Sequence, residues 1–505
     1  MTPGGEVGVP RPPNIVCIVA DDLGWRDLAC TGSPFYETPH IDQLAASGAR
    51  FARAYSPSPN CSPSRASLLT GRAPARIGLT QIVGGHSVGR LKDVPSFGML
   101  PRQEYTYARA LRRGGYRTWH VGKWHLGPEH SWPEHHGFDV NIAGCDAGQP
   151  RSWTSPYRLP TLPDGPQGEH LTDRLTDEAI GLMRRAATDR AAGQDNRPFL
   201  LNLWHYAVHT PLTDAPPRLV EQFTEKARRL GLREEDQIEI VGPYPHWRTD
   251  PAPMRRRHAQ GNPVYAAMVA HLDESVGRVL AELARLSLLE ETVVIFTSDN
   301  GGLHTGAAST ANLPLADGKG WLSEGGIRVP LIIRAPGVSA PGTVVDEPVV
   351  LADLYPSILQ LAGVATWHEE TTDGQSLVSL LKGEVGAGAR ALYWHFPHYT
   401  YTGATPASAV LNGRWKLIRR YEEGVDLLFD LELDPGETED VAAQNPDIVQ
   451  RLSADLNVWI ENVAGLVPAR NPRTPFEEFD HHGCADGGRS TEDVPFGGGL
   501  TGPER

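Results

Sequence analysis

Short apolar runs rich in β-branched residues alternate along most of this chain with longer segments that carry the apolar period of a helix. Strands separated by helical segments are typical of a parallel sheet whose two faces are both covered. We therefore expect an α/β fold in which a large, mostly parallel sheet is sandwiched by helices. The predicted strands span 14–20, 118–121, 199–204, 293–297 and 330–334, and the predicted helices include 38–55, 171–187 and 263–286. Thr38 as a cap and Pro39 at the first position signal the first of these helices.

The pattern changes near residue 390, where short strands follow one another with turn residues between them. These strands are predicted at 391–395, 408–411, 415–420 and 427–431, and a helix over 446–463, capped by Asn445, follows them. A chain of 505 residues exceeds the usual size of one hydrophobic core. We predict a main α/β domain at 1–385, a small antiparallel sheet-plus-helix subdomain at 386–467, and a loosely ordered or draped tail at 468–505.

The composition argues against several classes of partner. The formal net charge is −14 and no basic run offsets it, which disfavours nucleic acid. No apolar stretch approaches the roughly 20 residues that a membrane span needs. The five cysteines are scattered and odd in number, which predicts neither a disulfide framework nor a cysteine-based zinc site. The N-terminus lacks the basic region and apolar core of a secretory signal, so we expect a cytoplasmic protein.

Polar side chains cluster just beyond the ends of four predicted strands. They are Asp21 and Asp22, Lys123 and His125, His205 and His209, and Asp299 and Asn300. In open α/β sheets, ligands bind beyond the carboxyl ends of the strands, so these residues predict one shared site. The carboxylate and amide oxygens of the aspartates and Asn300 are ligands that a hard divalent cation prefers.

A second candidate feature is the segment Cys61-Ser62-Pro63-Ser64-Arg65. Pro63 fits the first turn of a helix, which puts Cys61 at a helix N-terminus. Backbone N–H groups and the helix dipole favour an anion there and would lower the pKa of a thiol. Arg65 lies four residues later on the same face, where its guanidinium suits a tetrahedral oxyanion. The alternative is a buried cysteine at an ordinary capped helix.

Several of these segments together resemble the type I sulfatase family. Residues 61–72 resemble its signature in full, and 122–127 resembles its second signature. Asp21-Asp22-Leu23-Gly24 and 298–301 resemble its two metal-binding motifs, Lys319 lies in a closely matching run at 318–330, and His209 matches a family histidine. The resemblance extends to about residue 465 and implies an alkaline-phosphatase-like fold.

The resemblance also implies a chemistry. Cys61 would be oxidised to Cα-formylglycine by a formylglycine-generating enzyme, and the hydrated aldehyde would attack the sulfur of a sulfate ester. Asp21, Asp22, position 61, Asp299 and Asn300 would bind a single Ca²⁺, with Mg²⁺ as the alternative. Asp299 would act as general base, and Arg65 and Lys123 would hold the sulfate oxygens. His209 with Lys319 would stabilise or protonate the leaving oxygen, and His125 would remove the proton that releases sulfate.

Two other functions stay open at this point. One is a phosphate or phosphonate ester hydrolase on the same scaffold, and the other is a non-catalytic sulfoglycan-binding protein. Aromatic residues at 394–399 and at Trp132, Trp153 and Trp321 could stack on a sugar, which favours a carbohydrate sulfate over a small aryl sulfate. The same aromatic residues could instead fill the core of the subdomain.

Overall fold

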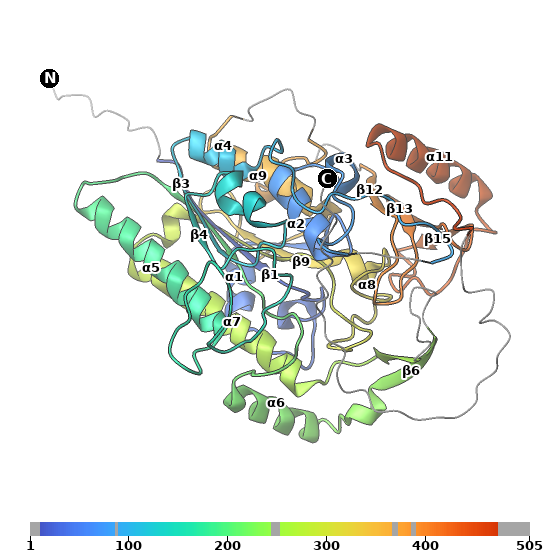
Figure 1. Ribbon diagram of the computed structural model, residues 1–505, viewed down its shortest axis with the longest axis horizontal. Coiled ribbons are helices and arrows are strands. Elements are labelled where there is room, and N and C mark those ends of the chain that lie inside the picture. Colours follow the sequence, from blue (N-terminus) through green and yellow to red (C-terminus); the bar gives the residue numbers. More distant parts are fainter. Residues whose placement is uncertain (1–10, 86–88, 244–252, 366–371, 385–389, 473–505) are drawn as a thin grey trace, which may run out of the picture.

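The computed structural model describes residues 11–85, 89–243, 253–365, 372–384 and 390–472, which form a large α/β body beside a smaller antiparallel sheet (Figure 1). The strands of the large sheet are β1 (Asn14–Ala20), β2 (Ala49–Tyr55), β3 (Arg117–Gly122), β4 (Val140–Ile142), β5 (Phe199–Trp204), β8 (Thr292–Ser298), β9 (Arg328–Arg334), β10 (Thr343–Val345) and β11 (Val349–Val350). A separate hairpin pairs β6 (Ile238–Pro243) with β7 (Pro253–Arg257). The predicted α/β fold is confirmed.

The large sheet runs in the order β10-β2-β9-β8-β1-β5-β3-β4. Strands β8, β1, β5, β3 and β4 are mutually parallel, whereas β9 is antiparallel to both of its neighbours. The carboxyl ends of β8, β1, β5 and β3 therefore lie side by side at one edge of the sheet.

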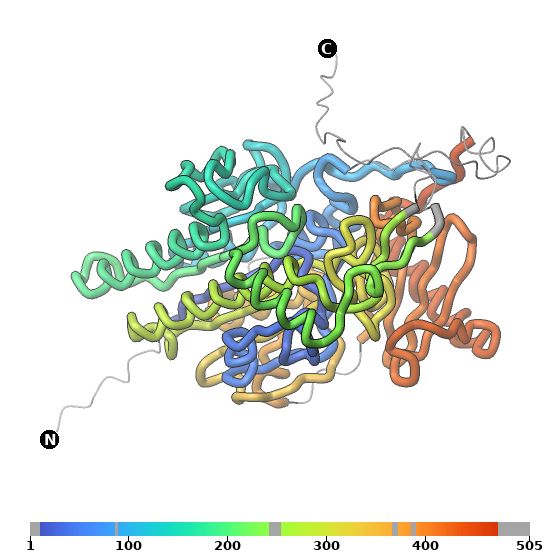
Figure 2. The backbone as a smooth tube through the Cα atoms, turned by 90° about the horizontal axis from the view of Figure 1, so that it is seen from below, coloured from blue at the N-terminus to red at the C-terminus, as the bar shows by residue number. Residues whose placement is uncertain are grey.

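Both faces of the sheet are covered because the central strands are apolar on both sides. Along β1, Val16 and Ile18 pack into one core cluster, and Ile15 and Cys17 pack into the other. The first cluster is closed by α1 (Pro39–Ser47), α5 (Leu171–Ala191), α6 (Pro217–Arg229) and α7 (Pro263–Arg285). The second is closed by α2 (Cys61–Thr70), α4 (Tyr107–Arg113) and α9 (Leu354–Leu361). The long helices α5 and α7 lie side by side in both views (Figures 1 and 2).

The smaller sheet lies at one end of the molecule with the helix α11 (Pro446–Asn462) (Figure 2). Its strands are β12 (Leu392–Phe396), β13 (Ala407–Asn412), β14 (Trp415–Arg420) and β15 (Val425–Asp430), all antiparallel and in that order. One face packs against α11, and the other packs against Tyr55, Leu322 and Ile327 of the large body. The remaining short helices are α3 (Pro74–Ile77), α8 (Glu324–Ile327) and α10 (Val378–Leu381). The predicted boundary at 385 and the tail from residue 473 onward lie outside the described residues.

The predicted helix over 38–55 is wrong in its second half. Helix α1 ends at Ser47, and residues 49–55 form strand β2. Gly48 separates the two, with an extended backbone and so little room that a Cβ atom would lie 2.6 Å from the carbonyl oxygen of Ile333. Pairing of β2 with β9 outweighs the local helix preference, because a strand at this position completes the sheet.

The predicted caps occupy the N-cap positions but do not bond as predicted. The Thr38 hydroxyl donates to Asp42 and accepts from the backbone N–H of Ala29 instead of capping α1. The Asn445 side chain likewise donates to the carbonyl oxygen of Val441. Among the described helices, none combines the length and apolar character needed to cross a membrane.

Candidate active site

The strand order brings the predicted site residues together at the carboxyl edge of the large sheet. Asp21 and Asp22 follow β1, and Asp299 and Asn300 follow its neighbour β8. The backbone joins these two strand ends directly, because the N–H of Asp299 donates to the carbonyl oxygen of Ala20 at 3.2 Å. The N–H of Asp22 also donates to the Asp299 carboxylate at 3.2 Å.

Beyond β3, a turn at Gly122 directs Lys123 into the site. Gly122 has φ +111°, and a Cβ atom there would lie 1.9 Å from the carbonyl oxygen of Trp204. This close approach lets the N–H of Lys123 donate to the same carbonyl oxygen at 2.7 Å. Residues two apart in an extended chain would face the same way, but His125 has φ +55°, so the chain is not extended there. A left-handed turn, rather than a strand, brings both residues to the site.

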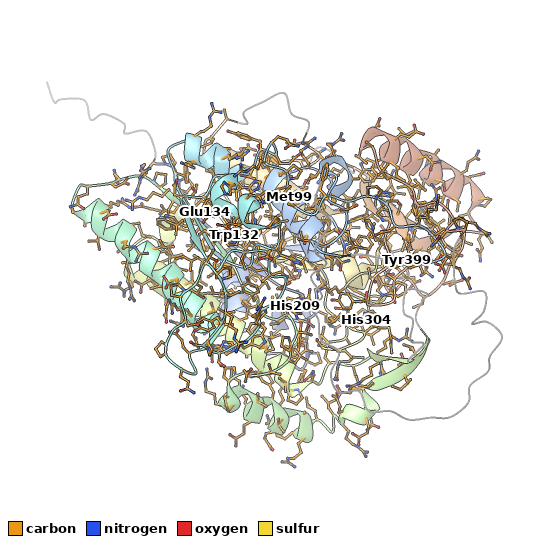
Figure 3. All side chains as sticks on the ribbon, viewed as in Figure 1. Met99, Trp132, Glu134, His209, His304 and Tyr399 are labelled. Atoms are coloured by element: carbon orange, nitrogen blue, oxygen red, sulfur yellow. The ribbon has the colours of Figure 1, made fainter. Side chains whose placement is uncertain are left out.

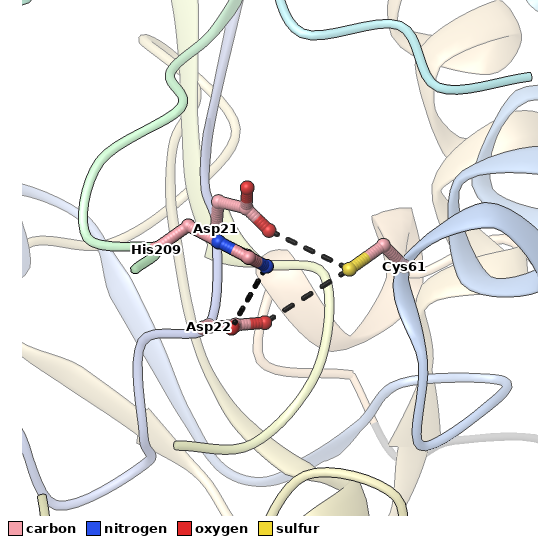
Figure 4. Close-up of side chains that lie close together, drawn as sticks. All are labelled: Asp21, Asp22, Cys61 and His209. Carbon is pink, nitrogen blue, oxygen red and sulfur yellow. Dashed lines mark hydrogen bonds and ion pairs between the residues drawn. The ribbon is translucent and has the colours of Figure 1, made fainter. Parts of the chain in front are cut away.

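Cys61 is the first residue of α2, as predicted, and it is almost fully buried. Its sulfur lies 3.6 Å from Oδ1 of Asp21 and 3.9 Å from Oδ1 of Asp22 (Figure 4). Burial raises the pKa of the thiol, although the ammonium groups of Lys123 and Lys319 lower it. The expected lowering of the thiol pKa at this helix N-terminus is therefore wrong, because desolvation outweighs the helix dipole.

Each of the three buried carboxylates has a cation of its own. Lys123 Nζ donates to Asp21 Oδ2 at 2.7 Å, and Lys319 Nζ donates to Asp22 Oδ2 at 2.8 Å. Arg65 Nε donates to Asp299 Oδ2 at 2.8 Å, and its Nη2 lies 2.8 Å from the same oxygen and 3.6 Å from Asp21 Oδ1. These three pairs balance in formal charge, and all six side chains are buried.

His209 lies near the middle of the molecule (Figure 3). Its Nε2 lies 3.5 Å from Asp22 Oδ2 (Figure 4) and close to Lys319 Nζ. Its Nδ1 lies 2.8 Å from the carbonyl oxygen of Thr210, which can only accept, so Nδ1 carries the proton. Its Nε2 therefore has a free lone pair and accepts from Lys319 Nζ at 3.1 Å. Burial and the Lys319 ammonium lower the pKa of His209 to about 3. Burial also holds the pKa of His125 well below its usual value.

Two other histidines lie outside this arrangement. The Nε2 of His205 is 3.0 Å from the hydroxyl of Ser275 on α7, so this buried histidine bonds to a core helix rather than to the site residues with which the sequence grouped it. His304 is buried, and neither ring nitrogen has a hydrogen-bond partner among the described residues.

The residues present fit a hard divalent cation. Ligand atoms of Asp21, Asp22, Cys61 and His209 lie within 4.8 Å of one another at this strand edge. The Nδ2 of Asn300 donates to Asp22 Oδ1 at 2.9 Å, while its buried Oδ1 has no hydrogen-bond partner. A buried carbonyl oxygen without a donor, beside anionic oxygens, is an environment that a cation would complete. His209 is the weaker candidate ligand because its Nε2 already accepts from Lys319.

The aromatic residues proposed for sugar stacking are mostly core residues. Trp153, Trp394, Phe396 and Tyr399 are buried, and Trp132 packs against the core from a partly buried position. Sequence reasoning missed Tyr401, whose side chain is 36% exposed and whose ring centroid lies 5.8 Å from Lys319 Nζ. No local sequence signal separates Tyr401 from its neighbours, because its position depends on how the subdomain packs.

A family model described as Sulfatase matches residues 13–364, and one described as N-sulphoglucosamine sulphohydrolase, C-terminal, matches residues 317–462. The chain belongs to the sulfatase family. It is therefore a sulfuric ester hydrolase.

Two relatives and one solved structure match the sulfatase over most of its length. It is 30% identical to a protein from Formosa agariphila named Sulfatase, over 93% of both chains. It is 33% identical to Arylsulfatase A of Homo sapiens, over 88% of this chain and 87% of that one. The crystal structure of Ps i-CgsB in complex with k-i-k-neocarrahexaose has a TM-score of 0.70 and 28% identity, and covers 89% of this chain and 93% of that chain.

Proposed function

We propose that this sulfatase hydrolyses sulfate monoesters of carbohydrates, through a formylglycine formed from Cys61 and a single divalent metal ion. The observation that carries the proposal is the position of Cys61, with its sulfur between Asp21 and Asp22. Arg65, Lys123 and Lys319 place three buried cations beside the aspartates around the same point.

The metal would be held by Asp21, Asp22, Asp299, Asn300 and position 61, because these residues supply oxygen donors at one strand edge. Ca²⁺ suits such a set of several flexible oxygen ligands, and Mg²⁺ is the alternative. When bound, the cation supplies positive charge that polarises the sulfate oxygens and favours the ionised form of the nucleophile. Elemental analysis of the purified protein tests this part of the proposal.

The formylglycine supplies a hydrated aldehyde as nucleophile, and a formylglycine-generating enzyme would have to make it. In the net reaction the sulfur–oxygen bond to the alcohol breaks, an oxygen from water ends on sulfur, and a proton ends on the alcohol oxygen. Asp299 is the residue that would take up the first proton, and His125 the residue that would take up the proton on release of sulfate. Burial lowers the pKa of His125, so the ring is neutral and offers a nitrogen lone pair for that proton, as a weaker base than a free imidazole.

The remaining residues bind the substrate. Arg65 and Lys123 would hold the non-bridging sulfate oxygens, because both cations lie buried next to Asp21. His209 and Lys319 would act on the bridging oxygen, since the Lys319 ammonium donates a hydrogen bond toward His209 Nε2 and can pass a proton to a leaving alkoxide.

A carbohydrate substrate is supported by the surroundings of the site. An open groove continues from His209 along Thr210, Pro211 and Leu212, and Tyr401 presents part of its ring beside Lys319. Both are suited to a sugar larger than a single aryl group. The saccharide complex of Ps i-CgsB, a structure with the same fold, is consistent with such a substrate.

The test compares wild type with Cys61→Ala, each produced with a formylglycine-generating enzyme. Mass spectrometry of the Cys61 peptide should show conversion to the aldehyde in wild type. Hydrolysis of aryl and carbohydrate sulfates should follow that conversion and should be lost in Cys61→Ala, whose folding is checked by its melting temperature. Turnover by Cys61→Ala at the wild-type rate, or faster hydrolysis of a phosphonate ester than of any sulfate ester, would overturn the proposal.

A further inference from the structure

Two adjoining hollows form a groove beside the site. One has a volume of about 920 Å³ and is lined by Gln149, Arg151, Thr210, Pro211 and neighbouring residues. The other has a volume of about 690 Å³ and extends from Cys145 to Arg151 and across to Arg158. Gln149 and Arg151 line both, so the two hollows are continuous, and we call them together the arginine groove.

Two residues of the active site, His209 and His125, adjoin the arginine groove. Thr210 follows His209, and its carbonyl oxygen accepts a hydrogen bond from His209 Nδ1. The carbonyl oxygen of Pro211 accepts a hydrogen bond from the indole nitrogen of Trp153 at 2.7 Å. On the other side, the carbonyl oxygen of Cys145 accepts from the N–H of His125 at 2.9 Å. Gly148 packs so closely on His125 that a Cβ atom would lie 2.7 Å from its ring. A sugar whose sulfate lies at Cys61 would therefore extend into this groove.

The groove carries positive charge without a carboxylate partner. The side chains of Arg151 and Arg158 are exposed, and over the residues that the structure describes neither makes an ion pair. Some exposed arginines elsewhere are paired, as Arg197 is with Asp195 and Arg228 with Glu225, while others, such as Arg185, make no ion pair in the described chain; Arg151 and Arg158 differ from these in lining one groove. Asp146 is the acidic residue of the lining, so two cations face one anion there in a protein whose net charge is −14. Free guanidinium groups in such a place are suited to an anionic ligand.

We propose that Arg151, assisted by Arg158, forms a second anion subsite. It would bind a second negatively charged group of the saccharide, either another sulfate or a carboxylate. This inference rests on the proposed function, because it assumes that the first sulfate is bound at Cys61. The planar guanidinium can donate two parallel hydrogen bonds to either group, which would orient the sugar as well as attract it.

The test is a comparison of substrates in Arg151→Gln and wild type, both carrying formylglycine. The four substrates are a neutral aryl sulfate, a neutral saccharide with one sulfate, the same saccharide with two sulfates, and a saccharide with one sulfate and one carboxylate. We expect kcat/KM to fall about tenfold or more for the doubly charged saccharides, and less than twofold for the first two substrates. The two doubly charged substrates reveal whether sulfate or carboxylate is the preferred second anion.

Arg185→Gln is the matched control. Arg185 is also exposed and without an ion pair in the described chain, but it lies on α5, roughly 21 Å along the helix from the end nearest the groove. This variant should behave as wild type. Arg151→Lys should recover part of the loss, and raising the ionic strength should reduce the difference between singly and doubly charged substrates in wild type.

Binding gives a readout that does not depend on turnover. Calorimetry with the disulfated saccharide and Cys61→Ala should give a Kd that becomes about tenfold weaker when Arg151→Gln is added. Equal losses on all four substrates, or an unchanged Kd, would overturn the subsite while leaving the sulfatase chemistry intact. Loss of all sulfate ester hydrolysis in wild type would instead count against the proposed function.

Discussion

His209→Gln should damage the hydrolysis of unactivated sulfate esters far more than that of activated ones. His209 Nδ1 is fixed by the Thr210 carbonyl oxygen at 2.8 Å, and its Nε2 lies 3.1 Å from Lys319 Nζ. A group at this point can stabilise the leaving oxygen only to the extent that the oxygen becomes negatively charged. An acidic phenol needs little such help, whereas the hydroxyl of a sugar needs a proton.

In this arrangement His209 Nε2 carries no proton, so Lys319 supplies the proton to the leaving oxygen and His209 positions the Lys319 ammonium. Such a proton transfer typically contributes roughly 10²- to 10⁴-fold. We expect kcat/KM to fall by about that factor for an alkyl or sugar sulfate, and by less than about tenfold for a nitrophenyl sulfate. Glutamine keeps an oxygen that can accept from Lys319, so the charge balance of the pocket is preserved.

The assay is a series of aryl sulfates whose phenols differ in acidity. The dependence of log(kcat/KM) on the pKa of the leaving phenol should become steeper in His209→Gln than in wild type. His205→Gln is the control. His205 is also buried and directly follows β5, but its side chain bonds to Ser275 instead of to Lys319. An equal loss for every leaving group would refute the assignment and would indicate that His209 acts on the sulfate rather than, through Lys319, on the leaving oxygen.

Two further predictions concern stability. Lys416 is fully buried and lies 2.9 Å from Glu324 and 2.8 Å from Glu437, so Lys416→Met removes the cation that the two buried carboxylates share and leaves only Arg328, 3.6 Å from Glu324. Urea unfolding should show a loss of about 3–5 kcal/mol in this variant and almost none in Lys382→Met, which changes an exposed lysine; a loss below about 1 kcal/mol would contradict it. Burial lowers the pKa of His120 to about 3, so the stability that its neutral form contributes is complete above about pH 6.5 and is lost as the pH falls toward 3. In His120→Phe, the unfolding free energy should depend less on pH between about pH 6 and pH 4, by up to about 1.4 kcal/mol per pH unit; an unchanged dependence would show that His120 is not buried in its neutral form.

Much of the fold could be predicted because its elements are locally strong. The run Asn14–Ala20 is apolar on both faces, and the pattern over 263–285 forms a helix capped by Asn262, whose side chain accepts from Val264 and Tyr265. Strand β2 could not be predicted, because residues 49–55 become a strand only by pairing with β9, whose residues lie far away in the sequence.

The candidate site was predictable for a related reason. Its residues follow strand ends, and a parallel sheet brings the ends of β8, β1, β5 and β3 to one edge. Tyr401 and Arg151 could not be found in this way. Tyr401 reaches the site because the smaller sheet packs on the large body, and Arg151 faces the groove through the path of a long loop.

The sequence by itself therefore determined the α/β class, the family and the residues that gather around Cys61, because each depends on short motifs and on the period of apolar residues. The tertiary structure decided the electrostatic state of the site. Burial raises the pKa of the Cys61 thiol where the helix N-terminus alone would lower it. The packing of the chain also pairs Lys123, Lys319 and Arg65 with Asp21, Asp22 and Asp299, respectively. Desolvation and charge pairing depend on distances between segments remote in the chain, so no local pattern encodes them.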